Sequence, residues 1–214
     1  MSLDARRLPR LLLIADGFSS GREGMEAASV REWIRRLTEA GVRWVSLRDH
    51  AADPEAFARD AGIFAADLRR VRPEVVLSVH GRLDVARRLG AGLHAGRRGA
   101  TVAEAVAAGL ANPVGASAHD AAELRAATEA GADYVTLSPI FATRTHPEAV
   151  PLGIPALRAA VDAASVPVLA LGGLTPARAR DVRLGGAHGV AVLSGLLDAS
   201  DPEAVLATFL KALG

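Results

Sequence analysis

The sequence predicts an α/β fold, a single (β/α)8 or TIM barrel that spans residues 1–214. Apolar runs of strand length alternate with amphipathic stretches of helix length, and the chain holds eight such pairs, which leaves about 27 of its 214 residues for each. Strands that alternate with helices form parallel sheet, and eight units in a chain of this size are typical of a closed barrel. A doubly wound open sheet is the alternative, since continuous apolar strands occur in both folds.

The individual elements can be assigned in order along the chain. Strands are expected at residues 11–16, 42–49, 74–80, 91–96, 113–119, 132–139, 166–173 and 189–195. Helices are expected at residues 26–40, 54–70, 82–89, 101–110, 120–131, 154–164, 175–186 and 201–213. Thr175-Pro176 and Asp201-Pro202 are typical helix starts, since a capping side chain precedes a proline. Glycines at 41, 131 and 185–186 stand where helices should end.

Composition excludes several classes of chemistry. The chain has no cysteine, which excludes disulfides, thiolate catalysis and cysteine-bound metals. Lys211 is its only lysine, which argues against a Schiff-base aldolase. The net charge of +1 gives no reason to expect nucleic acid or an acidic membrane surface as a partner, and no apolar run has the length of a membrane span. We therefore expect a cytoplasmic protein with a small-molecule ligand; a homodimer through helix faces stays open.

Glycines follow the last two expected strands, at the end of a barrel where function resides. Gly172 and Gly173 come after the seventh strand, and Ser194 and Gly195 come after the eighth. Glycines let backbone N–H groups approach an anion, and the following helix N-terminus adds a partial positive charge. One such loop could be a simple turn, but two on neighbouring strands predict a phosphate site.

The fifth expected strand ends in Ser117 and His119, which alternation places on the same side. A histidine at the mouth of a barrel can accept and donate a proton near neutral pH. The alternatives are a histidine that caps the next helix or one that is held neutral by the rim of the barrel.

Two further features point to the same end of the barrel. The segment at 139–153 is long for a compact barrel and is typical of a loop that covers a substrate, although it could be a disordered surface loop. Its donors include Thr143, Arg144, Thr145 and His146. Arg48 ends the second strand and needs an anionic partner there, which could be a substrate or the carboxylate of Asp49 or Asp84.

These residues resemble the thiamine-phosphate synthase and TenI barrels over nearly the whole chain. The most specific stretch is "GASAHDAAELRAATEAGADYVTLSPIFATRTH" at 115–146, followed by "VLALGGLTPARARDVRLGGAHGVAVLSGL" at 168–196. The resemblance implies a thiazole phosphate as ligand, with its phosphate held at Gly172, Gly173, Ser194 and Gly195. It also implies that Ser117, Thr143 and Thr145 contact the ligand and that Arg48 matches the arginine that faces a pyrimidine pyrophosphate in the synthases.

The chain departs from the synthase pattern where magnesium pyrophosphate would bind. The Asn-Asp pair after the third strand reads His80-Gly81, and the acidic stretch after the fourth reads Gly96-Arg97-Arg98-Gly99. Both carboxylates that could bind magnesium are absent, and hard oxygen ligands are what this ion requires. Arginines at 97 and 98 could instead bind pyrophosphate without a metal.

The resemblance is therefore closer to the TenI-type thiazole tautomerases, which need an acid/base group and an anion site but no metal. In this interpretation His119 transfers the proton, Arg48 pairs with the substrate carboxylate, and His80 and His146 lie at the substrate without a role we can assign. No cofactor is expected. The first alternative is a thiamine-phosphate synthase with magnesium, and the second is a phosphate-binding barrel without catalysis.

Overall fold

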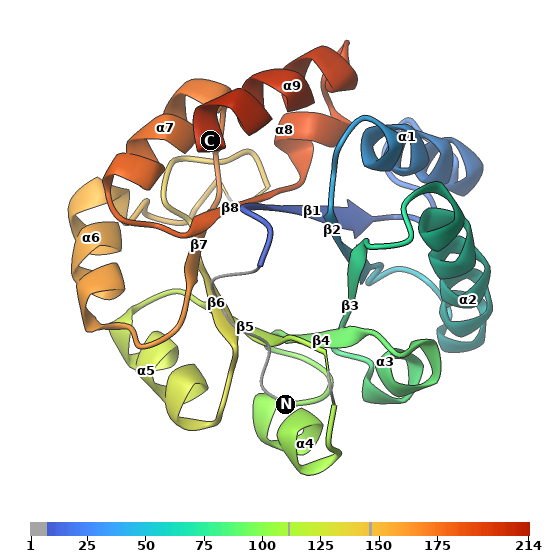
Figure 1. Cartoon of the computed structure of the whole chain (residues 1–214), viewed down its shortest axis with the longest axis horizontal. Helices are drawn as coiled ribbons and strands as arrows, with labels where there is room; N and C mark the ends of the chain where they lie inside the picture. Colours follow the sequence, from blue (N-terminus) through green and yellow to red (C-terminus); the bar gives the residue numbers. More distant parts are fainter. Residues whose placement is uncertain (1–7, 111, 146) are drawn as a thin grey trace.

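The strands form a closed parallel barrel in chain order, β1 to β8 (Figure 1). The structure is a computed structural model that describes residues 8–110, 112–145 and 147–214. The strands are β1 Leu11–Asp16, β2 Trp44–Arg48, β3 Val76–His80, β4 Gly92–Ala95, β5 Val114–Ala118, β6 Tyr134–Leu137, β7 Val168–Leu171 and β8 Gly189–Val192. β1 pairs with β8 in parallel, so the barrel prediction is confirmed and the open doubly wound sheet is excluded.

Helices surround the barrel on the outside (Figure 1). They are α1 Ala27–Glu39, α2 Pro54–Val71, α3 Leu83–Leu89, α4 Val102–Ala107, α5 Ala121–Glu129, α6 Gly153–Ala163, α7 Pro176–Leu184, α8 Ser194–Leu197 and α9 Pro202–Leu213. The short helix α8 was not expected from the sequence. The expected helix starts are confirmed, because Thr175 Oγ1 accepts from the N–H of Arg178 at 3.3 Å and Asp201 Oδ1 from that of Ala204 at 3.0 Å.

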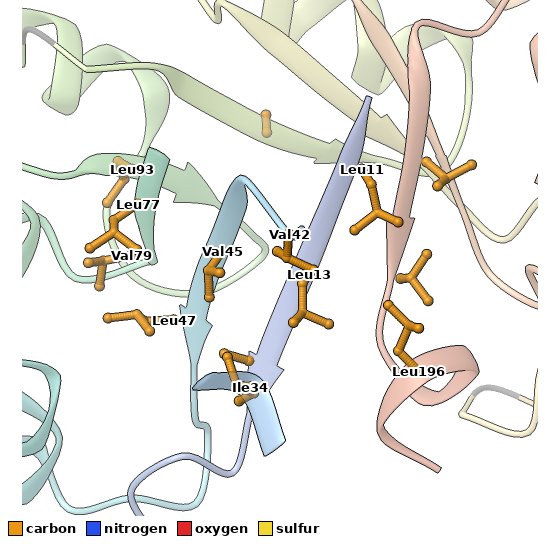
Figure 2. Close-up of a cluster of buried hydrophobic side chains, with 14 of the residues drawn as sticks. Leu11, Leu13, Ile34, Val42, Val45, Leu47, Leu77, Val79, Leu93 and Leu196 are labelled. Atoms are coloured by element: carbon orange, nitrogen blue, oxygen red, sulfur yellow. The ribbon is translucent and has the colours of Figure 1, made fainter. Parts of the chain in front are cut away.

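Alternation along each strand divides its apolar side chains between two cores. Figure 2 shows the outer one, where Leu11 and Leu13 of β1 lie with residues of β2, β3 and β4 between the sheet and the helices. Leu12 and Ile14 belong to the second cluster, together with Trp44 of β2 and Tyr134 of β6. The rings of Trp44 and Tyr134 come from strands on different sides of the barrel and have centroids 4.6 Å apart, so this cluster fills the barrel interior. Each fully buried side chain of this size stabilises the fold by roughly 1.5–3 kcal/mol.

A buried carboxylate fixes the loops that follow β1 and β2. Asp49 is 5% exposed and accepts hydrogen bonds from the N–H groups of Ser19, Ser20, Ala51 and Ala52 at 2.8–3.2 Å. The hydroxyl of Ser20 donates to it as well, at 2.7 Å. The carboxylate therefore holds two loops at the carboxyl end of the barrel in one arrangement.

Within the described part of the chain, no helix combines the length and apolar character needed to cross a bilayer.

Candidate active site

A cavity of about 600 Å³ opens at the carboxyl ends of the strands. The inner core closes the barrel below it, so the cavity is a basin rather than a channel. Its lining includes every predicted site residue that the structure describes: Arg48, His80, Ser117, His119, Thr143, Thr145, Gly172, Gly173, Ser194 and Gly195. His146 lies outside the described residues. The residues predicted from separate strand ends are thus brought to one place.

The turn after β7 is packed so closely that it requires glycine. Gly172 and Gly173 have φ angles of +96° and +62°, in the left-handed region that side chains disfavour. A Cβ on Gly173 would lie 2.3 Å from the carbonyl oxygen of Ala142, on the loop between β6 and α6. The N–H of Phe141 donates to the carbonyl of Gly172 at 3.2 Å. The glycine turn and the long loop therefore form one unit.

Backbone donors gather between this turn and the loop after β8. Ser194 and Gly195 are the first residues of α8, so their N–H groups have no acceptor within the helix. No hydrogen bond joins the N–H groups of Gly173, Ser194 or Gly195 to any other described residue. This end of the cavity can hold an anion through backbone donors.

His119 lies on the cavity wall with one ring nitrogen already engaged. Its Nδ1 is 2.7 Å from Oε2 of Glu123, one turn into α5, and its backbone N–H donates to the same oxygen at 2.8 Å. The His119 side chain is 35% exposed. It is thus neither the cap of α5, which is Asp120, nor a buried histidine bonded to backbone carbonyls. Nε2 is the ring nitrogen left for chemistry.

Ser117 is fixed from below by a buried histidine. Its Oγ is 3.0 Å from Nε2 of His94, whose Nδ1 is 3.0 Å from the hydroxyl of Tyr134. Complete burial lowers the pKa of His94 well below its usual value and raises that of Tyr134, so both are neutral near pH 7. A neutral chain of polar groups therefore holds the Ser117 hydroxyl at the floor of the cavity.

Arg48 has a partner that we did not expect. Its Nε is 2.9 Å from Oδ1 of Asp16 on the neighbouring strand, so the suggestion of Asp49 or Asp84 was wrong. Strand register explains the pair, because Asp16 and Arg48 are direct neighbours at the ends of β1 and β2. Asp49 is instead turned toward the loops that it holds. The charge of Arg48 is thus partly neutralised before any ligand binds.

Three histidines extend from Arg48 toward the barrel interior. The rings of His50 and His80 lie with centroids 5.3 Å apart, and so do those of His80 and His94. Burial, with the Arg48 guanidinium second, lowers the pKa of His80 to about 4 and also lowers that of His50. Near pH 7 these side chains add no positive charge to this half of the cavity.

The backbone leaves no room for a side chain at Gly81 and Gly99, the positions that the sequence resemblance matches to acids of the synthases. Gly81 has a φ of +68°, and a Cβ on it would lie 2.9 Å from the carbonyl oxygen of Arg98. A Cβ on Gly99 would lie 2.2 Å from the carbonyl oxygen of Gly81, which accepts from the N–H of Ala100 at 2.8 Å. The loops after β3 and β4 therefore pack backbone against backbone here, without room for a side chain.

Three residues of the site were missed in the sequence. Asp16 ends the strand beside that of Arg48, so a list of strand ends could have included it, whereas His94 lies within β4 opposite His80 and carried no such signal. Glu123 stands four residues after His119, a spacing that brings side chains together on a helix, but it resembled an ordinary first-turn acid.

Comparison with known proteins agrees with this geometry. The family model described as thiamine monophosphate synthase matches residues 19–196. The chain belongs to this family. It is 38% identical to a thiamine-phosphate synthase of Chloroflexus aurantiacus over 95% of this chain and 92% of that one. A thiamine-phosphate synthase of Koribacter versatilis is 34% identical, with 97% of each chain covered.

Solved structures point the same way. The thiamine phosphate pyrophosphorylase of Pyrococcus furiosus superposes with a TM-score of 0.82 at 26% identity, covering 98% of each chain. A 3-hexulose-6-phosphate synthase superposes with a TM-score of 0.69 at 18% identity, which shows a shared fold alone. The family members are therefore similar to this chain across the whole barrel.

Proposed function

We propose that the cavity binds a thiazole phosphate and that the protein acts on it as an enzyme of thiamine biosynthesis. The free backbone N–H groups of Gly173, Ser194 and Gly195 would hold the phosphate, as helix N-termini and glycine turns commonly do. Thr143 and Thr145 on the covering loop would contact the ring. The family membership supports the substrate class, and the donors on the cavity wall supply the means of binding it.

The geometry best supports a thiazole tautomerase. The observation that carries this proposal is the closed backbone at Gly81 and Gly99, where a magnesium pyrophosphate would need carboxylates. Glu148, on the covering loop, is the only acid among the described residues that line the cavity. These residues do not fit a magnesium pyrophosphate.

A tautomerase needs only what this cavity offers. Nε2 of His119 would take a proton from one ring atom of a carboxythiazole phosphate and return it to a substrate atom outside the ring, which yields the aromatic ring. The phosphate and carboxylate charges would be held at opposite ends, by backbone N–H groups and by the free nitrogens of Arg48. A positioned histidine of this kind contributes about 10²- to 10⁴-fold to the rate of a proton transfer.

Thiamine-phosphate synthase is the second candidate, and the names of the relatives favour it over the tautomerase. Arg48 and Arg97 both line the cavity, so two arginines could bind a pyrophosphate directly. Against it, Arg48 is already paired with Asp16 and the neighbouring histidines are neutral. Among the described cavity residues, this leaves chiefly Arg97 to supply uncompensated positive charge for a leaving group that carries several negative charges.

One pair of assays separates the candidates. Purified protein is given a pyrimidine pyrophosphate and a thiazole phosphate over a magnesium titration, and thiamine phosphate is measured; we expect none at any magnesium concentration. The carboxythiazole phosphate is then supplied without metal, and we expect isomerisation that falls about 10²- to 10⁴-fold in His119→Asn. Thiamine phosphate that rises with magnesium would establish the synthase instead. Phosphate binding without turnover of either substrate would indicate a barrel without catalysis.

A further inference from the structure

We propose that Glu123 is a positioning residue that fixes the tautomer of His119, so that Nε2 is the unprotonated nitrogen on the cavity side. The inference deepens the proposed function, because it assigns a partner to the group that would move the proton. It rests on the two hydrogen bonds that a single oxygen of Glu123 accepts from His119.

The chemistry of the two groups decides which nitrogen carries hydrogen. A carboxylate has only acceptor sites, whereas a neutral imidazole has one donor and one acceptor nitrogen. Because Nδ1 of His119 lies 2.7 Å from Glu123 Oε2, Nδ1 must be the donor. Nε2 then has its lone pair free, and no described residue occupies it with a hydrogen bond.

The same oxygen also fixes the orientation of the ring. It accepts from the backbone N–H of His119 at 2.8 Å, so the ring is tied to the main chain at the end of β5 through one shared atom. Ser117, two residues earlier, is held independently by His94. The ring of His119 therefore faces the cavity in one orientation, beside a serine that is also fixed.

A role in helix capping is the structural alternative. Glu123 is the third residue of α5, and Asp120 is the N-cap whose side chain accepts from the N–H groups of Ala122 and Glu123. In a capping box the acid at this position returns to the N-cap backbone, as Glu104 does to Thr101 on α4. Glu123 differs, because its hydrogen bonds go to the residue before the cap and to that residue's ring.

The proton balance of the reaction shows what Glu123 would contribute. When Nε2 removes a proton from the substrate, a C–H bond breaks, an N–H bond forms, the C–H electron pair passes into the π system of the substrate, and His119 becomes an imidazolium. Return of the proton to a second substrate atom breaks the N–H bond, forms the new bond from that electron pair, and leaves His119 neutral again. The carboxylate of Glu123 then faces a positive charge at 2.7 Å and stabilises it until the proton is returned. Glu123 gains no proton at any step. Both side chains are partly exposed, 35% and 42%, so water screens the effect.

The direct test is nitrogen NMR of histidine-labelled protein at pH 8, where imidazole is ordinarily neutral. The His119 signals are assigned by their loss in His119→Asn. We expect the Nδ1–H tautomer in the wild type and a shift toward Nε2–H in Glu123→Ala. Glu104→Ala is the matched control, since it removes an acid from the same position of a helix without touching a histidine. An Nε2–H tautomer in the wild type, or an unchanged one in Glu123→Ala, would overturn the proposal.

Kinetic measurements distinguish an effect of the Glu123 charge on turnover from a purely structural role of Glu123 at the start of α5. Glu123→Gln keeps an oxygen that can cap the helix but removes the negative charge, so we expect kcat for the carboxythiazole phosphate to fall about 2- to 5-fold with KM little changed, the range of a partly exposed ion pair. Wild-type kcat in Glu123→Gln would leave only the structural role. If the wild type does not turn over this substrate, the proposed function fails, while the NMR result still decides the role of Glu123.

Discussion

Replacement of Gly173 by alanine tests whether the turn after β7 is the phosphate site. A left-handed backbone costs an alanine roughly 1–2 kcal/mol. The new methyl would also lie 2.3 Å from the carbonyl oxygen of Ala142, so the turn and the covering loop must separate. Gly109→Ala is the control, because Gly109 has a similar φ of +66° with no atom within 4 Å of its Cβ position.

The two variants should differ in binding more than in stability. For a domain of this size, 1 kcal/mol lowers Tm by roughly 2–4 °C, so Gly109→Ala should fall by about 2–8 °C and bind ligand normally. In Gly173→Ala we expect at least one N–H donor to be displaced from the phosphate. A hydrogen bond to a charged group contributes about 1.5–3 kcal/mol, which predicts roughly 10- to 150-fold weaker binding.

Isothermal titration calorimetry with a thiazole phosphate measures this, with the Tm of each variant taken on the same samples. Inorganic phosphate serves as a second ligand that reports on the anion site alone. If Gly173→Ala bound both ligands as tightly as Gly109→Ala does, the turn would not be the phosphate site and the reasoning would be refuted.

Two further predictions concern stability. Asp49→Ala should leave four backbone N–H groups without an acceptor, that of Ala52 buried and the others partly buried. We expect the free energy of unfolding to fall by roughly 3 kcal/mol, against about 1 kcal/mol for the exposed helix cap in Asp53→Ala. Equal losses in urea unfolding would contradict the role of Asp49. The pKa of His80 is lowered to about 4 in the fold and is about 6.5 in the unfolded chain. Since the unfolded chain binds the extra proton between these values, the contribution of His80 to stability is fully present above about pH 6.5 and falls by roughly 3 kcal/mol as the pH drops to 4. His80→Gln should flatten this decline, and an unchanged slope would show that His80 does not cause it.

The barrel fold and many of the residues that line the cavity could be predicted, because both follow from the order of strands and helices in the sequence. Alternation of strands and helices gives the parallel sheet, and the rule that function lies after the strands selects residues such as Ser117, His119 and Gly172. No distance is needed for either step. The cavity then gathers residues that lie far apart in the sequence.

The pairings inside the site could not be predicted in the same way. Arg48 forms an ion pair with Asp16 only because the register of β1 against β2 places them side by side, and that register cannot be read from the sequence. His94 is buried below Ser117, which depends on how the barrel interior fills. Glu123 carried the sequence signal of a helix start, and only the position of the His119 ring shows its second contact.

The contact between Gly81 and Gly99 also has an evolutionary consequence. An aspartate introduced at either position alone would meet the main chain of the other loop, so each single step toward the synthase pattern would pass through a destabilised protein. The backbone opposes each of the two changes separately, since it occupies the space that the new side chain would need. Engineering of the synthase pattern into this chain should therefore exchange the loops after β3 and β4 together.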